Sequence, residues 1–329
     1  MALLEVKNLK VDYPLRSAFW SKKKFLHAVD DVSFTVDRGE TVGLVGESGC
    51  GKSSIAKALV RLEKITGGSV TLNNVDIAAL RGKSLRKARK DFQMVFQDPY
   101  GSLNPRLSIR NALEEVLTLH TDLNKKERQQ RMRELMQMVG LNPEQLDRYP
   151  HQFSGGQRQR IGIARALAAE PQLLIADEPV SALDVSVQAS IINLLKELQR
   201  STGIALLFIA HDLAVVEHIS DRILVMYLGR VVESAPATEL CSKPLHPYTA
   251  ALLAAVPTLE KRSVSNIKLA GDVPSPLDPP AGCAFHERCP FATAECSQKR
   301  PELREIAPGR FSACFHTNEN GIFTCAKPQ

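Results

Sequence analysis

The chain has 329 residues, of which 44% are hydrophobic and 24% charged, and its formal net charge is +6. This length predicts one large or two modest domains with a substantial core, and it excludes a disulfide-stapled miniprotein or a disordered tail. A membrane-spanning helix needs about 20 mostly apolar residues, yet no uninterrupted apolar stretch exceeds seven residues. Glu5 and Lys7 place charge where a signal peptide needs its apolar core. We therefore expect a globular, cytoplasmic protein that does not cross a bilayer by itself.

The charge balance and the cysteines leave several kinds of partner open. The 42 Lys and Arg residues against 36 Asp and Glu residues suit nucleic acid, an acidic membrane face or mere solubility. Five of the seven cysteines lie after residue 280, namely Cys283, Cys289, Cys296, Cys314 and Cys325. In a reducing compartment such clustering indicates a metal rather than disulfides.

A glycine-rich loop gives the first strong signal. A polar excursion at residues 14–27 precedes an expected strand at 32–36, and the short apolar run Thr41–Val45 follows. The next residues, Gly46-Glu-Ser-Gly-Cys-Gly-Lys52-Ser53, match the P-loop pattern between a strand and a helix. The backbone N–H groups of such a loop turn toward phosphate oxygens, and the following helix adds the positive end of its dipole.

The side chains of this loop predict how it would hold a nucleotide. We expect Lys52 to reach the β- and γ-phosphates and Ser53 to bind Mg²⁺, whereas Cys50 serves as a small spacer. The candidate nucleotide-binding residues are Gly46, Ser48, Gly49, Cys50, Gly51, Lys52, Ser53 and Ser54.

Between about residues 85 and 150 the apolar residues recur at helical spacing. Residues three and four apart share one face of a helix. Two such faces are formed by Ile109, Leu113, Val116 and Leu117, and by Met132, Leu135, Met136 and Val139. We predict a helical subdomain at about residues 85–165, with the methionines filling its core.

A second candidate anion site follows this insert. The sequence Phe153-Ser154-Gly155-Gly156-Gln157 opens an expected helix that runs through Ala169. A serine and two glycines at a helix N-terminus can cradle an anion, so one chain carries two phosphate-binding sequences.

Two further apolar runs end in polar residues. Residues 173–176 precede Asp177, and residues 205–209 come shortly before His211. Runs without alternation are typical of strands buried on both faces of a parallel sheet, so an α/β fold is expected. Ligands of such sheets lie beyond the carboxyl ends of the strands, and Gly46, Asp177 and His211 should line the site.

The carboxylates of Asp177 and Glu178 should take different tasks. Adjacent residues at a strand end point in different directions. We expect Asp177 to hold Mg²⁺ and Glu178 to polarise the attacking water as a general base.

The ordered set of motifs resembles the ATP-binding subunits of ABC transporters, whose signature is Leu-Ser-Gly-Gly-Gln. Phe153 replaces the leading leucine. The resemblance covers about residues 3–235 and implies a P-loop ABC ATPase cassette with a helical subdomain. It also implies a head-to-tail dimer in which the signature residues Ser154, Gly155, Gly156 and Gln157 of one subunit cap the ATP held by the other.

Several further residues match family motifs by position. The resemblance implies that Gln97 contacts Mg²⁺ or water and couples to the membrane partner, and that the segment 181–184, ending at Asp184, crosses the dimer interface. It implies that His211 contacts the γ-phosphate. Tyr13 matches the aromatic residue that stacks on adenine, with Trp20 and Phe25 as alternatives.

The C-terminal part narrows the resemblance. After Val231 the regular pattern fades, and an appendage is expected from about residue 240, giving a cassette at 1–240 and an extension at 241–329. The segment Leu245-His-Pro-Tyr-Thr249 and the sequence Asp184-Val-Ser-Val-Gln188 resemble ATPase subunits of peptide and nickel importers. The chain as a whole is most similar to the second ATPase subunit of dipeptide importers.

The cysteine spacing alone does not identify a metal. Cys283, Cys289, Cys296 and Cys314 lack the paired spacing usual for zinc ribbons and ferredoxin-type clusters, although four thiolates could order a segment with little core. The resemblance implies a [4Fe-4S] cluster there. Structural zinc, with His286 or His316, and free cysteines remain alternatives.

The function implied is ATP-driven import at the cytoplasmic face of the bacterial inner membrane. The implied partners are a paralogous ATPase subunit, two transmembrane permease subunits and an extracytoplasmic binding protein, and the cargo is a dipeptide, another small peptide or nickel. The competing class is a soluble ABC ATPase that acts on nucleic acid or ribosomes. DNA-repair members carry very long inserts before the signature, but here Lys52 and Ser154 are about 100 residues apart. Translation factors carry two cassettes, and P-loop kinases lack the signature, so no nucleic-acid partner is expected.

Overall fold

The computed structural model describes residues 2–15, 25–255, 271–319 and 321–322. The chain divides into two compact units. Unit 1 comprises residues 1–4, 36–41 and 72–209, and unit 2 comprises residues 5–35, 42–71 and 210–329. Each unit is therefore built from segments that lie far apart in the sequence.

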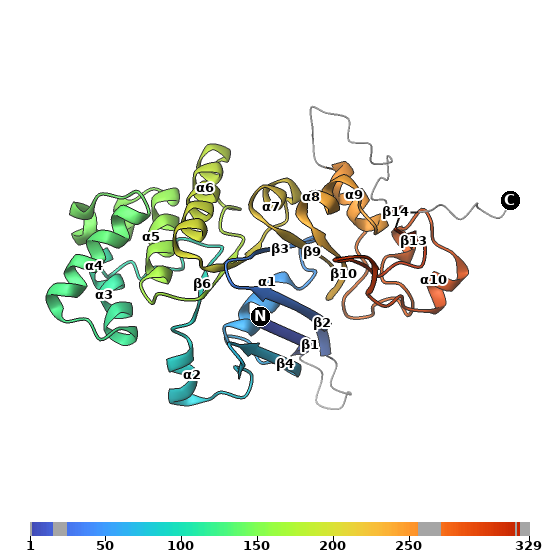
Figure 1. The fold of residues 1–329 in the computed structure, drawn as a ribbon, viewed down its shortest axis with the longest axis horizontal. Helices are drawn as coiled ribbons and strands as arrows, with labels where there is room; N and C mark the ends of the chain where they lie inside the picture. Colours follow the sequence, from blue (N-terminus) through green and yellow to red (C-terminus); the bar gives the residue numbers. More distant parts are fainter. Residues whose placement is uncertain (1, 16–24, 256–270, 320, 323–329) are drawn as a thin grey trace. The chain divides into compact units, whose positions relative to one another are not determined.

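The N-terminal strands of unit 2 form a small sheet in the order β2-β1-β4 (Figure 1). These strands are β1 (Ala2–Pro14), β2 (Phe25–Asp37) and β4 (Gly67–Leu72). The strand expected at residues 32–36 is confirmed, and Val32, Phe34 and Val36 are buried at every second position. The polar excursion was predicted too long, because β2 already begins at Phe25. The left-handed backbone of Asp31, at φ 64°, interrupts the alternation and hides the first half of this strand from a periodicity argument.

A second group of strands in unit 2 joins the P-loop strand to the C-terminal segment. Strand β3 pairs in parallel with β9, β10 pairs antiparallel with β9, and β12 pairs antiparallel with both β10 and β11. The bounds are β3 (Thr41–Val45), β9 (Arg222–Tyr227), β10 (Arg230–Pro236), β11 (Arg304–Ala307) and β12 (Arg310–Ser312). Because Glu233 of β10 faces Ser312 of β12, the late part of the chain extends the cassette's own strands.

The expectation that regular structure fades after Val231 is wrong. Strand β10 continues to Pro236, and two helices follow it directly. The first of these helices is only six residues long, and β10 and the second helix are mostly buried, so these elements offer few of the periodic polar positions that reveal a strand or helix in a sequence. The helices of unit 2 are α1 (Lys52–Leu59), α7 (Leu213–Ile219), α8 (Ala237–Ser242), α9 (Pro247–Ala255), η3 (His286–Arg288) and α10 (Ala294–Gln298), and its last strands are β13 (Thr317–Asn318) and β14 (Gly321–Ile322).

Unit 1 contains three parallel strands in the order β6-β7-β8. They are β6 (Phe92–Val95), β7 (Leu173–Asp177) and β8 (Ala205–Ile209). Every residue of β7 and β8 is buried, which confirms the two strands predicted from unbroken apolar runs. In this register Asp177 lies opposite Ile209, so the carboxylate segment stands at the carboxyl end of the strands, as expected.

Helices make up most of the rest of unit 1. They are α2 (Gly82–Ala88), α3 (Ile109–His120), α4 (Lys125–Met138), η1 (Pro143–Asp147), η2 (Pro150–Gln152), α5 (Gly155–Leu167) and α6 (Val185–Thr202), and a short strand, β5 (Val75–Asp76), precedes them. The stretch predicted as helical from about residue 85 also contains β6. Helix α4 begins at a capping box, in which the Asn124 side chain accepts from the backbone N–H of Glu127 and Glu127 reciprocates.

The two predicted apolar faces form the core of this helical part. Ile109, Leu113 and Leu117 of α3 are fully buried, while Val116 is only half-buried. In α4 the buried residues are Met132, Leu135 and Met136. The methionines therefore fill the core rather than present a docking surface.

Truncation of this core should be costly. Leu135→Ala removes a side chain with 0% exposure and should lower the free energy of unfolding by about 2–5 kcal/mol. The matched control is Leu119→Ala on α3, because Leu119 is 59% exposed and should change stability by less than about 0.5 kcal/mol. Urea titrations followed by circular dichroism measure both. Equal effects of the two substitutions would contradict the packing described here.

Candidate functional site

The P-loop of unit 2 is shaped by close backbone contacts. Gly51 caps α1 with φ 105°, and a Cβ placed there would lie 2.1 Å from the Ala28 carbonyl oxygen. A Cβ at Gly46 would lie 2.3 Å from the Met226 carbonyl oxygen. Only glycine tolerates these approaches, so the two motif glycines are required by their neighbours as well as by the loop.

The side chain of Lys52 is buried, with 4% exposure, and lies inside the loop. Its Nζ donates to the Gly46 carbonyl at 2.7 Å and to the Glu47 carbonyl at 3.0 Å. Cys50 is also 4% exposed, and burial raises the pKa of its thiol. The thiol is therefore protonated near neutral pH, which agrees with a spacer rather than a reactive group.

Two other predicted residues lie in the same unit as the P-loop. The hydroxyl of Tyr13, in β1, donates to Ser54 Oγ in α1 at 3.3 Å, so its ring stands beside the loop helix. The Ala210 N–H donates to the Leu44 carbonyl of β3 at 3.2 Å, and this brings His211 to the end of the P-loop strand. Of the alternatives to Tyr13, Phe25 is 44% exposed, and Trp20 lies outside the described residues.

Unit 1 carries the predicted carboxylates and Gln97. Asp177 ends β7 and is 4% exposed. Gln97 Nε2 donates to Glu178 Oε2 at 3.0 Å, which joins two predicted catalytic residues 81 positions apart in the chain. Glu178 has φ 45°, a conformation that is unfavourable for a residue with a Cβ and concentrates at functional sites. Its N–H donates to the Ile209 carbonyl, and this bond holds the strained turn.

The signature segment lies against the segment that carries Asp184. Ser154 is the N-cap of α5, and its Oγ accepts from the Gln157 N–H while Gln157 Oε1 accepts from the Ser154 N–H. A Cβ at Gly156 would lie 2.4 Å from Val187 Cγ1, and one at Gly155 would lie 3.4 Å from Leu183 Cδ2. Small residues are thus needed where α5 begins, and Asp184 immediately precedes α6.

The predicted residues fall into two groups. Unit 2 brings together the P-loop, Tyr13 and His211, whereas unit 1 brings together Gln97, Asp177, Glu178, the signature and Asp184.

Comparison with known proteins assigns the chain to a family. A model of the "ABC transporter" family matches residues 29–181, and one of the "Oligopeptide/dipeptide transporter, C-terminal region" matches residues 232–296. The oligopeptide transport ATP-binding protein AppF of Bacillus subtilis is 51% identical over 95% of this chain and 96% of its own length. A probable peptide ABC transporter ATP-binding protein of Sinorhizobium fredii is 53% identical over 95% of this chain and 89% of its own length. This chain belongs to the peptide-transport family of ABC ATP-binding proteins.

Solved structures of ABC ATP-binding cassettes share the fold. A dimeric cassette bound to ADP and phosphate, MJ0796, has a TM-score of 0.62 at 31% identity and covers 71% of this chain and 98% of its own. The cassette cbiO1 of Clostridium perfringens has a TM-score of 0.62 at 28% identity, covering 73% and 90% of the two chains. The predicted ABC ATPase fold is thereby confirmed.

The four candidate cysteines of this ABC protein lie around one small cavity. Cys283, Cys289, Cys296 and Cys314 all line a space of about 10 Å³, and none of the described cysteines is in a disulfide. Burial raises the pKa of Cys283 to about 11 and that of Cys289 to about 12. Four thiols match the donor set of a Cys₄ metal centre. However, within the described residues no group of three or more His, Cys, Asp or Glu side chains has an arrangement that could hold a metal ion.

Two residues that contact the P-loop, Arg288 and Tyr248, were not assigned to the nucleotide site by the sequence analysis. Arg288 donates two hydrogen bonds to the Glu47 carboxylate, and the Tyr248 hydroxyl accepts from the Glu47 N–H. Glu47 occupies a variable position of the P-loop pattern. Arg288 lies between Cys283 and Cys289, which were considered as metal ligands. The available signals were an acidic residue within the phosphate loop and an arginine directly before Cys289.

The close approach at Gly51 gives a direct test of the ATP site. Gly51→Ala should weaken ATP binding by at least about tenfold, because the new Cβ would force the Ala28 carbonyl and the loop apart. Equilibrium titration with a fluorescent ATP analogue measures the affinity. The control is Gly203→Ala. Gly203 has a similarly left-handed backbone, at φ 69°, but a Cβ added there would meet open space. It should cost about 1 kcal/mol of stability and leave ATP affinity unchanged, and a similar loss of affinity in both variants would refute the steric argument.

Proposed function

We propose that this chain is the ATP-hydrolysing subunit of a peptide importer and couples ATP binding and hydrolysis to uptake of dipeptides or related small peptides. One observation carries the proposal: a complete ABC nucleotide-binding motif set and a C-terminal region of the oligopeptide/dipeptide transporter type occur in one chain. The names of the two relatives, peptide and oligopeptide transport proteins, support the cargo class.

The residues divide the work of hydrolysis. The P-loop amides and Lys52 bind the phosphates, and Tyr13 stacks on the adenine. Ser53, Gln97 and Asp177 would hold Mg²⁺, which neutralises phosphate charge when bound. Glu178 accepts the proton of the attacking water as general base.

The Gln97 amide positions this base. Its Nε2 donates to Glu178 Oε2, so the carboxylate is oriented by a residue that begins the segment leading to the helical part. His211 contacts the γ-phosphate, and the signature residues act on ATP held by a partner subunit. A shift of the Gln97 segment would therefore change the orientation of the base.

The partners follow from the same proposal. A paralogous ATPase subunit supplies the other half of each ATP site, two permease subunits form the pathway through the membrane, and an extracytoplasmic protein delivers the peptide. No helix in the described ranges is long and apolar enough to span a bilayer. We place the chain at the cytoplasmic face of the inner membrane, with a cassette at residues 1–240 and an extension at residues 241–329.

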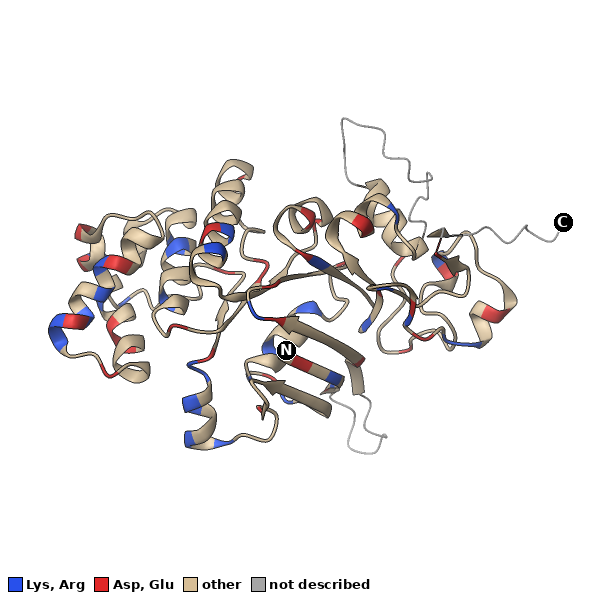
Figure 2. Cartoon of the chain, viewed as in Figure 1, with Lys and Arg blue, Asp and Glu red and all other residues tan. Residues whose placement is uncertain are grey.

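The nucleic-acid alternative gains no support from the helical part of unit 1. Lys and Arg are interspersed with Asp and Glu along α3 and α4, while α2 is basic (Figure 2). The basic excess is thus mixed with acid over the larger helices, and neither named relative acts on nucleic acid by its printed name.

The four cysteines around the small cavity form a candidate metal centre. We propose that Cys283, Cys289, Cys296 and Cys314 hold a [4Fe-4S] cluster, with structural zinc as the alternative. Convergence of four thiols from a proline-rich segment supports a Cys₄ centre. Because burial raises the thiol pKa values, metal binding would displace protons and become stronger with rising pH.

The role of Glu178 is tested in the assembled transporter. Glu178→Gln should retain ATP binding and lower the ATPase rate by about 10²–10⁴-fold, with loss of labelled dipeptide uptake into proteoliposomes. Glu144→Gln, an exposed residue of the same unit, is the charge-matched control and should behave as the original chain. An unchanged ATPase rate in Glu178→Gln would exclude the assignment. Recovery of the tagged chain from membranes without permeases, bound to nucleic acid instead, would reject the importer.

The metal is tested on anaerobically purified protein. A [4Fe-4S] cluster predicts broad visible absorption and about four irons per chain, whereas zinc predicts no visible band and one zinc. Cys296→Ser should lower the metal content, and Cys241→Ser, a buried cysteine outside the cavity, should not. Protein without either metal would reject both forms of the proposal.

A further inference from the structure

The second residue of the P-loop, Glu47, is bound by two residues from the C-terminal part of the chain. Arg288 Nη1 donates to Glu47 Oε2 at 2.7 Å, and Nη2 donates to Oε1 at 3.0 Å. The backbone N–H of Glu47 donates to the Tyr248 hydroxyl at 2.9 Å. One P-loop residue is thereby fixed at both its backbone and its side chain by residues that follow it by 201 and 241 positions.

The groups that hold Glu47 are themselves buried and well supported. Tyr248 and Tyr227 are among the largest fully buried side chains, and their rings lie 4.7 Å apart. Phe285 lies 5.4 Å from each of these rings. The Arg288 side chain is only 5% exposed, and its Nη1 also donates to the Tyr227 hydroxyl at 3.3 Å. Aromatic packing of this kind leaves the hydroxyl and the guanidinium little freedom to move.

The buried carboxylate of Glu233 binds the backbone just before α9. Glu233 is 0% exposed, and its two carboxylate oxygens accept from the N–H groups of Leu245 and His246 at 2.7 and 2.8 Å. These bonds fix the entry to α9, which carries Tyr248. Strand β10 thus sets the position of the helix whose tyrosine reaches the P-loop.

The contacts of Arg288 and Tyr248 with Glu47 should affect phosphate binding by the loop. The loop binds anions through backbone N–H groups, so a free carboxylate within it would repel the phosphates. Arg288 forms a bidentate, partly buried pair with that carboxylate, the strongest ordinary form of such a contact. It neutralises the Glu47 carboxylate, and the Tyr248 hydroxyl fixes the direction of the backbone N–H of Glu47 itself. Both contacts act on the loop rather than on the nucleotide.

We propose that Arg288 and Tyr248 are positioning residues of the ATP site, and that the C-terminal extension holds the P-loop in its phosphate-binding shape. The nucleotide site of this chain then includes a part of the extension. Arg288 directly precedes Cys289 and follows Cys283 by five positions. A change in the conformation of the cysteine segment would therefore move Arg288 and alter its contact with the P-loop.

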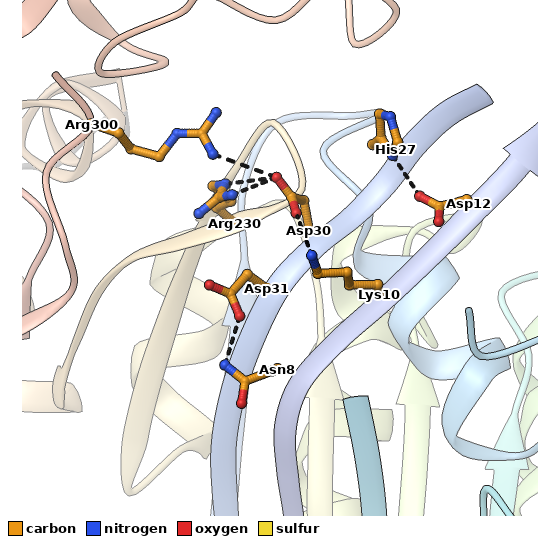
Figure 3. A network of polar contacts seen from close by, with 8 residues as sticks. All are labelled: Asn8, Lys10, Asp12, His27, Asp30, Asp31, Arg230 and Arg300. Carbon is orange, nitrogen blue, oxygen red and sulfur yellow. Dashed lines mark hydrogen bonds and ion pairs between the residues drawn. The ribbon is translucent and has the colours of Figure 1, made fainter. Parts of the chain in front are cut away.

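A second contact of the extension provides a matched control. Arg300 forms an ion pair of 3.6 Å with Asp30, which also binds Arg230 and Lys10 (Figure 3). This network joins the extension to β1, β2 and β10 and includes no P-loop residue. Arg300→Gln therefore removes an arginine from the same extension without touching Glu47.

The test measures ATP affinity of the full-length chain with a fluorescent ATP analogue. Arg288→Gln should weaken binding by about tenfold, Tyr248→Phe should weaken it by a smaller factor, and Arg300→Gln should leave it unchanged. In the assembled transporter Arg288→Gln should raise the KM for ATP more than it lowers kcat. Unaltered ATP affinity in Arg288→Gln, or equal losses in Arg288→Gln and Arg300→Gln that follow the fall in melting temperature, would overturn the proposal.

Coupling to Glu47 separates positioning from general destabilisation. In a Glu47→Gln background the carboxylate no longer needs neutralising, so adding Arg288→Gln should cost much less affinity than it does alone. Additive losses would contradict the mechanism. Arg288→Lys keeps the charge without the bidentate geometry and should give an intermediate affinity, and it serves as the readout if Arg288→Gln does not fold.

Discussion

The close approach of backbone to backbone around the P-loop is the constraint on which unit 2 depends. The loop has a defined shape because the carbonyls of Ala28 and Met226 stand where side chains of Gly51 and Gly46 would be. The Gly229 N–H donates to the Cys50 carbonyl, and the Gly229 carbonyl accepts from the Asp30 N–H. The β9–β10 turn therefore links the loop to β2. Strands that contribute no side chain to a nucleotide still determine whether the loop can bind one.

Unit 1 meets a different constraint, which is backbone strain. Glu178 has a left-handed backbone directly after a buried strand, and its carbonyl accepts from both the N–H and the hydroxyl of Ser181. These bonds, with that from its own N–H to Ile209, offset a conformation that costs of order 1 kcal/mol or more. The Glu178 carboxylate accepts a hydrogen bond from Gln97. Asp177, one residue earlier, ends β7 and is 4% exposed, so the two adjacent acids lie in different environments.

Local patterns made most of the fold predictable from the sequence. The strands 173–176 and 205–209, the helix faces of α3 and α4 and the P-loop glycines each rest on neighbours a few residues apart, and such patterns survive without knowledge of tertiary structure. The elements after Val231 were missed because α8 has only six residues, while β10 and α9 are mostly buried and show almost no alternation between polar and apolar positions. The contacts of Glu47 were missed for another reason. They join positions more than 200 residues apart, and no periodicity carries that information.

The C-terminal extension, residues 241–329, has a small core. In this core aromatic rings pack around Phe285, and four thiols line a cavity of about 10 Å³, a volume on the scale of one water position. The 3₁₀ turn η3 runs between two of the cysteines, Cys283 and Cys289. Arg288 is the last residue of this turn. Any change in the positions of these cysteines must preserve the turn's geometry if the guanidinium is to stay on Glu47, so we expect the cysteine segment and the P-loop to be energetically coupled through this ion pair and through the packing of Phe285 on Tyr248.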